Sequence, residues 1–590
     1  MFLTRHGIPP ARGSLTPRPG ISRVHSTLSI REDYIPNPLA AALQAVSSSN
    51  RPVNIQHQAS IGGPTGLASQ PTTAISLPEG VLAQQQQLPD ANRVTSSRGT
   101  SITGAPSFTS DAGSFVPTLD GRGNDIEGML GEILDMDDGG MSWDGQSIFT
   151  NEEDEESSDE ERDKGMSDEA KILRWRGRRK HFFILSGAGK PVYSRHGNGS
   201  GTEQMLVSGY MGVIQTIISF FHDSGGGSGG SGDSLRSFVA GKCKFVIVKE
   251  EGPLYLVAVS RLPCESDAQL RTQLDKLYSQ VVATLTVSAL TKVFTQREGF
   301  DLRRLLGGTE VFLDGLSDAM TRGDPGTLLS ALECVRLRKR ERERVHGVLL
   351  KERSEKLLYG MVVADGRLVG VVRPRRHSLH PMDLQVVFGM LFNASTFRDT
   401  AGEHWIPICL PKFNSKGYLY AYIHFWRREL AIVLISADPS SFFELRTMKG
   451  ANGYSVDEVL ASSRRGAPPT HLPRVLHFLY KSRRNVQFTM PSWEPHFSTQ
   501  RARRRVMCVY QALHAKVHRA QDGGGGVGVK VHFERVGGWV AVAWVGGGWE
   551  VYVVAQGKEE ERGLAEAAAR IVRWVGREEE RVFVVGGAVF

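Results

Sequence analysis

The fold is decided first by one short stretch of sequence, His181-Phe182-Phe183-Ile184-Leu185-Ser186-Gly187-Ala188-Gly189-Lys190-Pro191-Val192-Tyr193. Two runs rich in aromatic and β-branched residues flank a small, polar segment, and this pattern predicts a strand, a turn and a second strand. The apolar segment 205–221 then predicts a helix, followed by a Gly/Ser linker at 225–232. Three more strands are expected at 237–240, 244–248 and 254–259, before a helical pattern at 267–285 that continues towards residue 306.

The same order of elements recurs twice further along the chain. The second copy has strands at 357–363 and 368–372, a helix at 384–392, strands at 405–410, 418–426 and 430–436, and a short helix at 441–448. The third copy has strands at 475–480 and 486–490, a helix at 498–520, strands at 527–533, 539–545 and 549–554, a helix at 559–575 and a closing strand at 582–585. Residue identity between the copies is low, so the repeat is one of architecture.

These repeats predict a fold of the α/β (α+β) class with three units. Each unit is expected to be a five-stranded, mostly antiparallel sheet with helices packed against it. We place the units at 171–345, 346–465 and 466–590. The Asp365-Gly366 pair supplies the turn residues of a hairpin in the second unit, and the alternation of Tyr418, Tyr420 and Tyr422 supports a strand there.

Residues 1–170 differ from the rest of the chain in charge and composition. They contain 24 acidic and 11 basic residues, a net −13, whereas the remainder contains 39 and 60, a net +21. Their Ser, Gly, Pro and Gln content predicts a disordered region, in which the apolar spacing at 39–46 and 126–134 indicates either short helices or chance. The acidic run at 152–161 includes Ser157 and Ser158, which are candidate phosphorylation sites. This region is either a solvated tail or a regulator that modulates the basic body.

Composition disfavours several classes of protein. The five cysteines lie at least 21 positions apart and form no CxxC pair, which makes a structural zinc site or a disulfide framework improbable. There is no uninterrupted run of ~18 apolar residues, which argues against a spanning helix. The N-terminus lacks the charged start and apolar core of a secretion signal. We therefore expect a soluble protein of a reducing compartment.

Apparent catalytic and metal-binding motifs lack residues that their chemistry requires. Gly187–Lys190 has no Ser/Thr magnesium ligand and leads into a strand, so a hairpin turn is expected rather than a phosphate loop. His514 and His518 have zinc-ligand spacing, but Lys516 lies between them and no Glu does, so surface histidines are expected. Glu403-His404 has no third partner nearby, and neighbours on a strand point to opposite faces. We expect no bond chemistry, no metal and no cofactor.

Basic clusters indicate an anionic partner. They lie at 336–344, 481–484 and 501–505, and each one alone is compatible with a solvated face. Together they favour an acidic membrane surface over nucleic acid, although the segment 416–423 partly matches an RNA-binding strand and keeps nucleic acid as an alternative. The candidate membrane-binding residues are Arg338, Lys339, Arg340, Lys481, Arg483 and Arg484.

Three groups of segments resemble the SAND/Mon family of vacuolar fusion proteins. They are Lys180–Gly197, then Phe392–Ser395 with Thr400–Pro411 and with Phe413-Asn414 running into Gly417-Tyr418-Leu419, and finally His477–Ser482. Because these segments lie in all three predicted units, the resemblance covers essentially residues 171–590. It implies that each unit is a longin domain.

The resemblance also implies a function. It implies a heterodimer with the Ccz subunit that acts as a nucleotide exchange factor for the late-endosomal/vacuolar Rab GTPase, in endosome maturation, vacuole fusion and autophagosome–vacuole fusion. The expected location is cytoplasmic, peripherally associated with late endosome, multivesicular body and vacuole membranes. Further implied partners are an anionic, phosphoinositide-containing membrane and an early-endosomal Rab as recruiter. Exchange would stabilise the nucleotide-free GTPase by moving its switch I and disturbing magnesium.

The candidate residues for contacting the GTPase or the partner lie in the first unit. They are Ser186, Lys190 and Tyr193 of the hairpin, and Tyr210 and Ile214, which we place on the outer face of the first helix. The alternative is that these residues serve only longin pairing or packing. A non-catalytic longin adaptor or tether in membrane trafficking is the alternative function.

Overall fold

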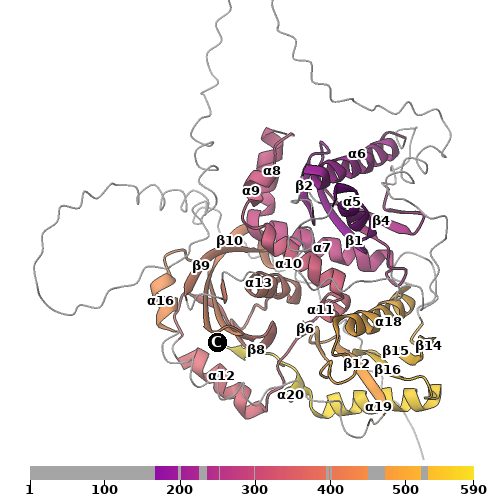
Figure 1. The fold of residues 1–590 in the computed structure, drawn as a ribbon. Coiled ribbons are helices and arrows are strands. Elements are labelled where there is room, and N and C mark those ends of the chain that lie inside the picture. The colour runs from indigo at the N-terminus through magenta and orange to yellow at the C-terminus, as the bar shows by residue number, and fades with distance from the viewer. Residues whose placement is uncertain are drawn as a thin grey trace, which may run out of the picture. The chain divides into compact units, whose positions relative to one another are not determined.

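The computed structural model describes residues 167–196, 201–224, 235–250, 253–297, 299–351, 353–393, 397–398, 402–448, 472, 474–519 and 529–590 (Figure 1). All of them belong to one unit of the chain, Gly63–Phe590, and they form three sheets of five, six and six strands. The expected features of residues 1–166 and the Gly/Ser linker at 225–232, including Ser157 and Ser158, lie outside the described residues.

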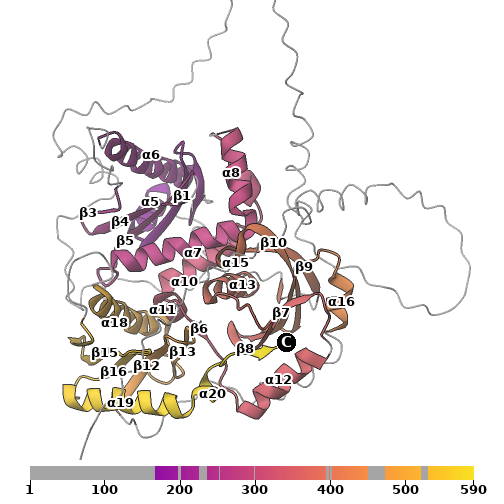
Figure 2. The same ribbon diagram turned by 180° about the vertical axis from the view of Figure 1, so that it is seen from behind.

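The first sheet has the strands that the sequence predicts, in the order β2-β1-β5-β4-β3 with every neighbouring pair antiparallel. The strands are β1 (Lys180–Ser186), β2 (Pro191–Ser194), β3 (Ser237–Ala240), β4 (Cys243–Lys249) and β5 (Leu254–Ser260). The helices α5 (Asp168–Gly177) and α6 (Gly201–Ser224) lie on one face, and α7 (Asp267–Leu285) lies on the other (Figures 1 and 2). The sequence pattern did not indicate α5.

Burial on both faces explains why the middle of β1, Phe182–Leu185, is continuously apolar. Phe183 and Leu185 pack among the residues of α5 and α6, whereas Phe182 and Ile184 pack among those of α7. Successive side chains of a strand point to opposite faces, so a strand covered on both sides needs a continuous apolar run. The opening stretch of sequence therefore occupies the centre of the first unit.

The helical pattern after α7 is divided at Thr286. This residue has a φ of +59°, and its hydroxyl accepts a hydrogen bond from the backbone N–H of Ala289, which starts α8 (Val287–Gln296) at 82° to α7. Three further helices follow, α9 (Arg303–Leu306), α10 (Glu310–Arg322) and α11 (Pro325–Leu329). The predicted helical continuation thus becomes a series of short helices beside the first sheet.

The second sheet is built from β7 (Leu357–Ala364), β8 (Arg367–Arg373), β9 (Glu403–Leu410), β10 (Ser415–Arg427) and β11 (Leu430–Ser436). Helix α13 (Pro381–Asn393) covers one face, and α12 (Lys339–Lys351) and α16 (Phe442–Thr447) cover the other, with α15 (Pro411–Asn414) between β9 and β10. The predicted unit boundary at residue 345 falls inside α12, which packs on β8. The boundaries themselves stay predictions.

The third sheet repeats this arrangement. Its strands are β12 (Val475–Ser482), β13 (Gln487–Thr489), β14 (Val531–Val536), β15 (Trp539–Val545) and β16 (Trp549–Gln556). Helix α18 (Gln500–His518) packs on one face, and α19 (Glu561–Arg577) packs on the other (Figure 1). The α/β architecture of three sheet units with flanking helices is confirmed.

Two short strands cross between the predicted units and were not expected. The strand β6 (Leu332–Glu333) adds to the third sheet in parallel with β13, and β17 (Ala588–Val589) adds to the second sheet in parallel with β8. The predicted closing strand at 582–585 is wrong, because Val582 ends the helix α20 (Glu579–Val582). The Gln487 side chain accepts from the N–H of Val584 and donates to its carbonyl, replacing a strand partner there.

Candidate functional site

The predicted hairpin residues divide into two buried side chains and one exposed side chain. The hydroxyl of Ser186 accepts from the backbone N–H of Lys190 at 3.0 Å, and the turn between them is the hairpin turn that the sequence favoured over a phosphate loop. Tyr193 is buried and donates to Asp314 of α10 at 2.8 Å. Lys190 is exposed, and its Nζ donates to the carbonyl of Gly299 at 2.6 Å.

The placement of Tyr210 and Ile214 on the outer face of α6 is wrong. Their exposed fractions are 2% and 1%, because they point at the sheet and pack with Phe183 and with Trp175 of α5. A helix lying on a sheet turns its most apolar stripe inward, and these two residues belong to that stripe. Their burial agrees with the packing alternative.

The exposed face of α6 carries residues that the sequence analysis missed. Met205 is 74% exposed, and Phe220 and Phe221 are each 43% exposed at the other end of the helix. Between them Gly209 and Gly212 are exposed, and a Cβ built on either would have nothing within 4 Å. The spacing of 205, 209, 212 and 220 along a helical repeat was the available signal. This face has glycines without side chains in its middle and exposed apolar side chains at both ends.

Part of α6 also has the length and composition of a membrane span, although it contains no uninterrupted apolar run of that length. Gln204–Phe221 has a mean hydropathy of 1.3, and the bent pair of α7 and α8 passes the same test as one broken span. The contacts of α6 account for the buried third of this segment, since its inner stripe packs on the first sheet. Length and composition by themselves do not distinguish the two situations.

Five of the six predicted membrane-binding residues are exposed, namely Arg338, Lys339, Arg340, Arg483 and Arg484. The first three lie at the start of α12, and Arg484 lies in the turn after β12. Both places adjoin α20: Lys339 pairs with Glu580 at 3.0 Å, and Asn485 donates to Glu579 at 3.1 Å. The tertiary structure thus brings two predicted clusters to one helix, with acidic residues between them.

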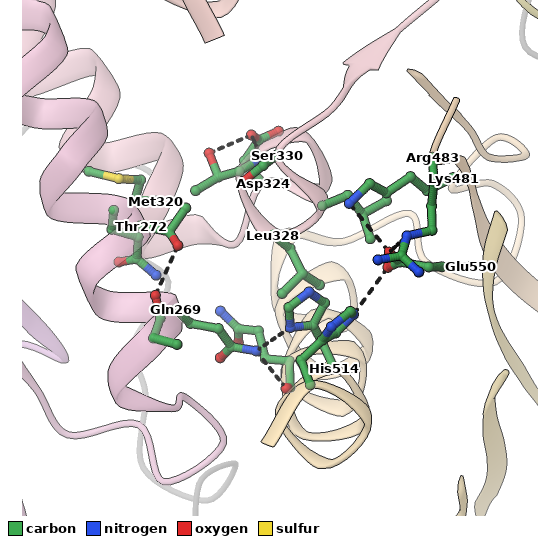
Figure 3. A pocket seen from close by; sticks show the side chains of 16 residues that line it. Gln269, Thr272, Met320, Asp324, Leu328, Ser330, Lys481, Arg483, His514 and Glu550 are labelled. Atoms are coloured by element: carbon green, nitrogen blue, oxygen red, sulfur yellow. Dashed lines mark hydrogen bonds and ion pairs between the residues drawn. The ribbon is translucent and has the colours of Figure 1, made fainter. Parts of the chain in front are cut away.

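Lys481 lies elsewhere, which corrects its assignment to a membrane surface. It points into a cavity of about 230 Å³ between the first and third units, where its Nζ is 3.5 Å from Glu550 (Figure 3). Arg483 is exposed, and its Nε lies 3.4 Å from the same carboxylate oxygen. Both cations lie beside this carboxylate, because a buried anion without partners is strongly unfavourable.

His514 and His518 line the same cavity, so their placement on the surface is also wrong (Figure 3). His518 lies 3.2 Å from Glu550, which is almost fully buried, and His514 contacts the side-chain amide of Gln269 in the first unit. Burial and, to a lesser extent, the neighbouring His518 lower the pKa of His514 to about 3. Glu550 was missed, since one acidic residue in a strand gives no signal in the sequence.

The chemistry of Glu550 is that of a paired carboxylate. Burial by itself would raise its pKa, but the hydrogen bond with His518 and the charge of Lys481 lower the pKa to about 2. The ligand atoms of His514, His518 and Glu550 lie within 4.8 Å of one another, as a metal site requires. Both carboxylate oxygens already have partners, however, and a divalent cation would meet the positive charges of Lys481 and Arg483. The site is better suited to joining two units than to holding a metal.

A second buried group joins the same two units. Lys180 of β1 pairs with Glu265, and both side chains are buried. Gln511 of α18 donates to that carboxylate at 2.9 Å, and Gln269 of α7 donates to the backbone carbonyl of Gln511, also at 2.9 Å. The first and third units therefore share a satisfied polar interface.

The remaining motifs also have structural roles. Tyr420 and Tyr422 of the RNA-like strand are buried, and the ring of Tyr422 lies against Phe442 of α16. Glu403 pairs with Arg446 at 2.8 Å, whereas His404 packs edge-on against Phe397. The aromatic side chains of the RNA-like strand β10 therefore form core contacts rather than an exposed stacking surface.

Comparison with protein families agrees with the three sheets. The first, second and third longin domains of FUZ, MON1 and HPS1 match residues 180–316, 355–451 and 474–579. Vacuolar fusion protein MON1 of Yarrowia lipolytica is 44% identical over 423 residues, 70% of this chain and 75% of that protein. Protein SAND of Takifugu rubripes is 32% identical over 75% of this chain and 82% of its own length.

A relative from a bird extends the comparison. Vacuolar fusion protein MON1 homolog A of Gallus gallus is 32% identical over 422 residues, 70% of this chain and 73% of that protein. The resemblance inferred from the sequence segments is thereby confirmed, and the three sheet units are longin domains. This chain belongs to the MON1/SAND family of vacuolar fusion proteins.

Proposed function

We propose that this chain is a subunit of a heterodimeric guanine-nucleotide exchange factor, formed with the Ccz subunit, that activates the late-endosomal/vacuolar Rab GTPase. Its relatives are named as vacuolar fusion proteins and match it over most of their length, which supports a role in vacuolar and endosomal fusion. The proposal extends to endosome maturation and to autophagosome–vacuole fusion.

Nucleotide exchange needs a binding surface rather than a catalytic group. A factor accelerates GDP release when it binds the nucleotide-free GTPase more tightly than the GDP-bound form, because a ligand shifts an equilibrium only by its differential affinity. The single observation that carries the proposal is the exposed α6 face, with Met205, Gly209, Gly212 and Phe220. Small residues let another backbone approach closely, and the flanking apolar side chains supply contact area. Lys190 is the one predicted hairpin residue in this unit that remains exposed.

We assign the membrane contact to the exposed basic residues at the start of α12, with Arg484. The charges of Arg338, Lys339 and Arg340 favour an anionic leaflet containing phosphoinositide. Each charge contributes about 1 kcal/mol to the free energy of binding near such a surface. This gives the protein a cytoplasmic, peripheral position on late endosome, multivesicular body and vacuole membranes, with an early-endosomal Rab as recruiter. The acidic residues 1–170 would compete with the membrane for these cations.

The test is release of fluorescent GDP from the vacuolar Rab by the purified heterodimer with the Ccz subunit. The complex should accelerate release of GDP. The double variant Met205→Asp/Phe220→Asp should give an acceleration at least about tenfold smaller, since a charge buried at an apolar contact is costly. Phe443→Asp is the matched control, because Phe443 is an exposed aromatic residue of the second domain, and it should leave release unchanged.

Two other outcomes would contradict parts of the proposal. An intact heterodimer that does not accelerate GDP release would exclude the exchange factor and leave a non-catalytic longin adaptor or tether. Equal activity of the α6 double variant and the wild type would remove the α6 face from the binding surface. Size-exclusion chromatography of each variant complex distinguishes lost pairing from lost exchange.

A further inference from the structure

A second cavity, of about 290 Å³, lies where the three longin domains meet. It adjoins the cavity of His514 and Glu550, because Asp324 and Thr327 line both, but neither His514 nor Glu550 lines it. Its walls come from α7 of the first domain, from α13 and the β7–β8 turn of the second, and from β13 of the third. A molecule bound there would touch all three domains at once.

Lys276 of α7 lines this cavity with a charge that the protein compensates poorly. The residue is 4% exposed, and within the described part of the chain its Nζ donates one hydrogen bond, to the carbonyl of Gly326 at 3.4 Å. Burial lowers the pKa of Lys276 to about 8, and Asp324 opposes this shift only in part. A buried ammonium group ordinarily has a carboxylate in contact or several short hydrogen bonds.

Two amide side chains beside Lys276 each have an unused polar atom. Gln280, one helical turn further along α7 and 2% exposed, has no hydrogen-bond partner for its Nε2 among the described residues. The Nε2 of Gln385 donates to the carbonyls of Gly326 and Ala331, but its Oε1 has no partner in the same part of the chain. Lys276 and Gln385 share the Gly326 carbonyl, which places their side chains together. The cavity thus offers donors and one acceptor that the protein does not use.

Three carboxylates also line the cavity, and one of them, Asp324, lies beside this polar cluster: a Cβ built on Gly326 would be 3.2 Å from its Oδ2 and 3.4 Å from the Nε2 of Gln385. Asp324 caps α11 by accepting from the N–H and the hydroxyl of Thr327. Asp365 belongs to the exposed β7–β8 turn, where Arg367 lies 3.8 Å from it. The charge near Lys276 is that of its own ammonium group, opposed in part by Asp324.

We propose that this cavity binds a small organic anion that carries a hydroxyl group. Its anionic oxygens would accept from the Nζ of Lys276 and the Nε2 of Gln280, and its hydroxyl would donate to the Oε1 of Gln385. Leu316, Val386 and Phe488 supply apolar walls for a short carbon chain. The volume falls at the lower end of ligand cavities, about 300 Å³, so the ligand is limited to a few carbon atoms.

The test uses the full chain and three probes of this class: glycerol 3-phosphate, lactate and malate. Isothermal titration calorimetry should show saturable binding of at least one, and that probe should raise the melting temperature. Glycerol, which has hydroxyl groups and no charge, should not bind. Lys276→Met should weaken binding by about tenfold or more, as expected for a lost charged hydrogen bond, and Gln280→Leu should weaken it less. Lys292→Met, at an exposed position of α8, is the matched control and should bind as the wild type does.

The ligand-free protein gives a second measurement that does not depend on which anion is bound. Lys276→Met should raise its melting temperature, because an uncompensated buried charge is removed and the side-chain volume is nearly kept. A lowered melting temperature would mean that the protein already satisfies Lys276 and would overturn the proposal. Failure of all three anions to bind, or binding of glycerol as tight as theirs, would overturn it equally. GDP release is not involved, so this outcome is separate from that of the proposed function.

Discussion

At the scale of single residues, burial decides which side chains are available for function. Ser186, Tyr193, Tyr210 and Ile214 are all buried, although sequence patterns placed them at a binding surface. Hydrophobic spacing identifies the helix containing Tyr210, but both faces of α6 carry apolar residues, so the pattern does not indicate which face meets the sheet. The buried face of α6 is the one that packs against the residues of the first sheet.

Glu550 leads to a prediction about stability. Glu550→Gln should lower the free energy of unfolding by about 3 kcal/mol, because it leaves Lys481 and Arg483 beside a neutral group. Urea denaturation followed by fluorescence measures this change. Glu566→Gln is the matched control, since Glu566 forms exposed i,i+4 pairs with Arg562 and Arg570 and should cost less than about 0.5 kcal/mol. Equal effects of the two variants would contradict the paired role of Glu550.

The same carboxylate predicts a dependence on pH. The folded pKa of Glu550, about 2, lies below its ordinary value of 4.5, so ionised Glu550 stabilises the folded state above pH 4.5. Protonation of the unfolded chain begins near 4.5, and the contribution is lost as the pH falls towards 2. The difference in stability between the wild type and Glu550→Gln should therefore narrow below pH 4.5. A difference that stayed constant over this range would exclude an electrostatic origin.

At the scale of elements, local sequence was sufficient wherever the turn chemistry was specific. Asp365 and Gly366 have φ angles of +49° and +70°, the left-handed conformations that a tight hairpin requires, and the hairpin of β7 and β8 forms where the sequence predicted it. The division of the helical region at Thr286 was not predictable in the same way. A positive φ at a threonine is unusual, and it is held there by the packing of α7 and α8.

Two glycines give a paired prediction at this scale. Gly366→Ala should destabilise the second domain by about 1 kcal/mol, because alanine resists a positive φ. Gly347→Ala, in the exposed part of α12, should stabilise the domain by about 1 kcal/mol through helix propensity. Neither added methyl group meets another atom within 4 Å, so the opposite signs come from the backbone alone. Melting temperatures of the two variants check this, and shifts of the same sign would contradict it.

At the scale of the whole molecule, the crossing strands connect domains that the sequence treats as separate repeats. The strand β17 pairs with β8, and the ring of Phe590 lies under the guanidinium of Arg353 at 4.4 Å. Deletion of residues 586–590 should increase hydrogen exchange of the β8 amides at 371–373 and of the amide of Arg375, which donates to the carbonyl of Phe590, since the pairing segment is removed. The amides of β15 serve as the internal control and should not change. Unaltered exchange in β8 would show that β17 adds nothing to the second sheet.

The sequence by itself determined most of the order of strands and helices, the three repeats, the hairpin turns and the family, because these depend on side-chain periodicity, turn residues and contiguous segments. Only the tertiary structure decided which face of α6 is exposed, that Lys481, His514 and Glu550 meet in a cavity, and that Lys276 lies beside Gln385. These side chains come from different elements or depend on which side of a helix is covered. Such placements follow from packing among distant segments, which no local pattern records.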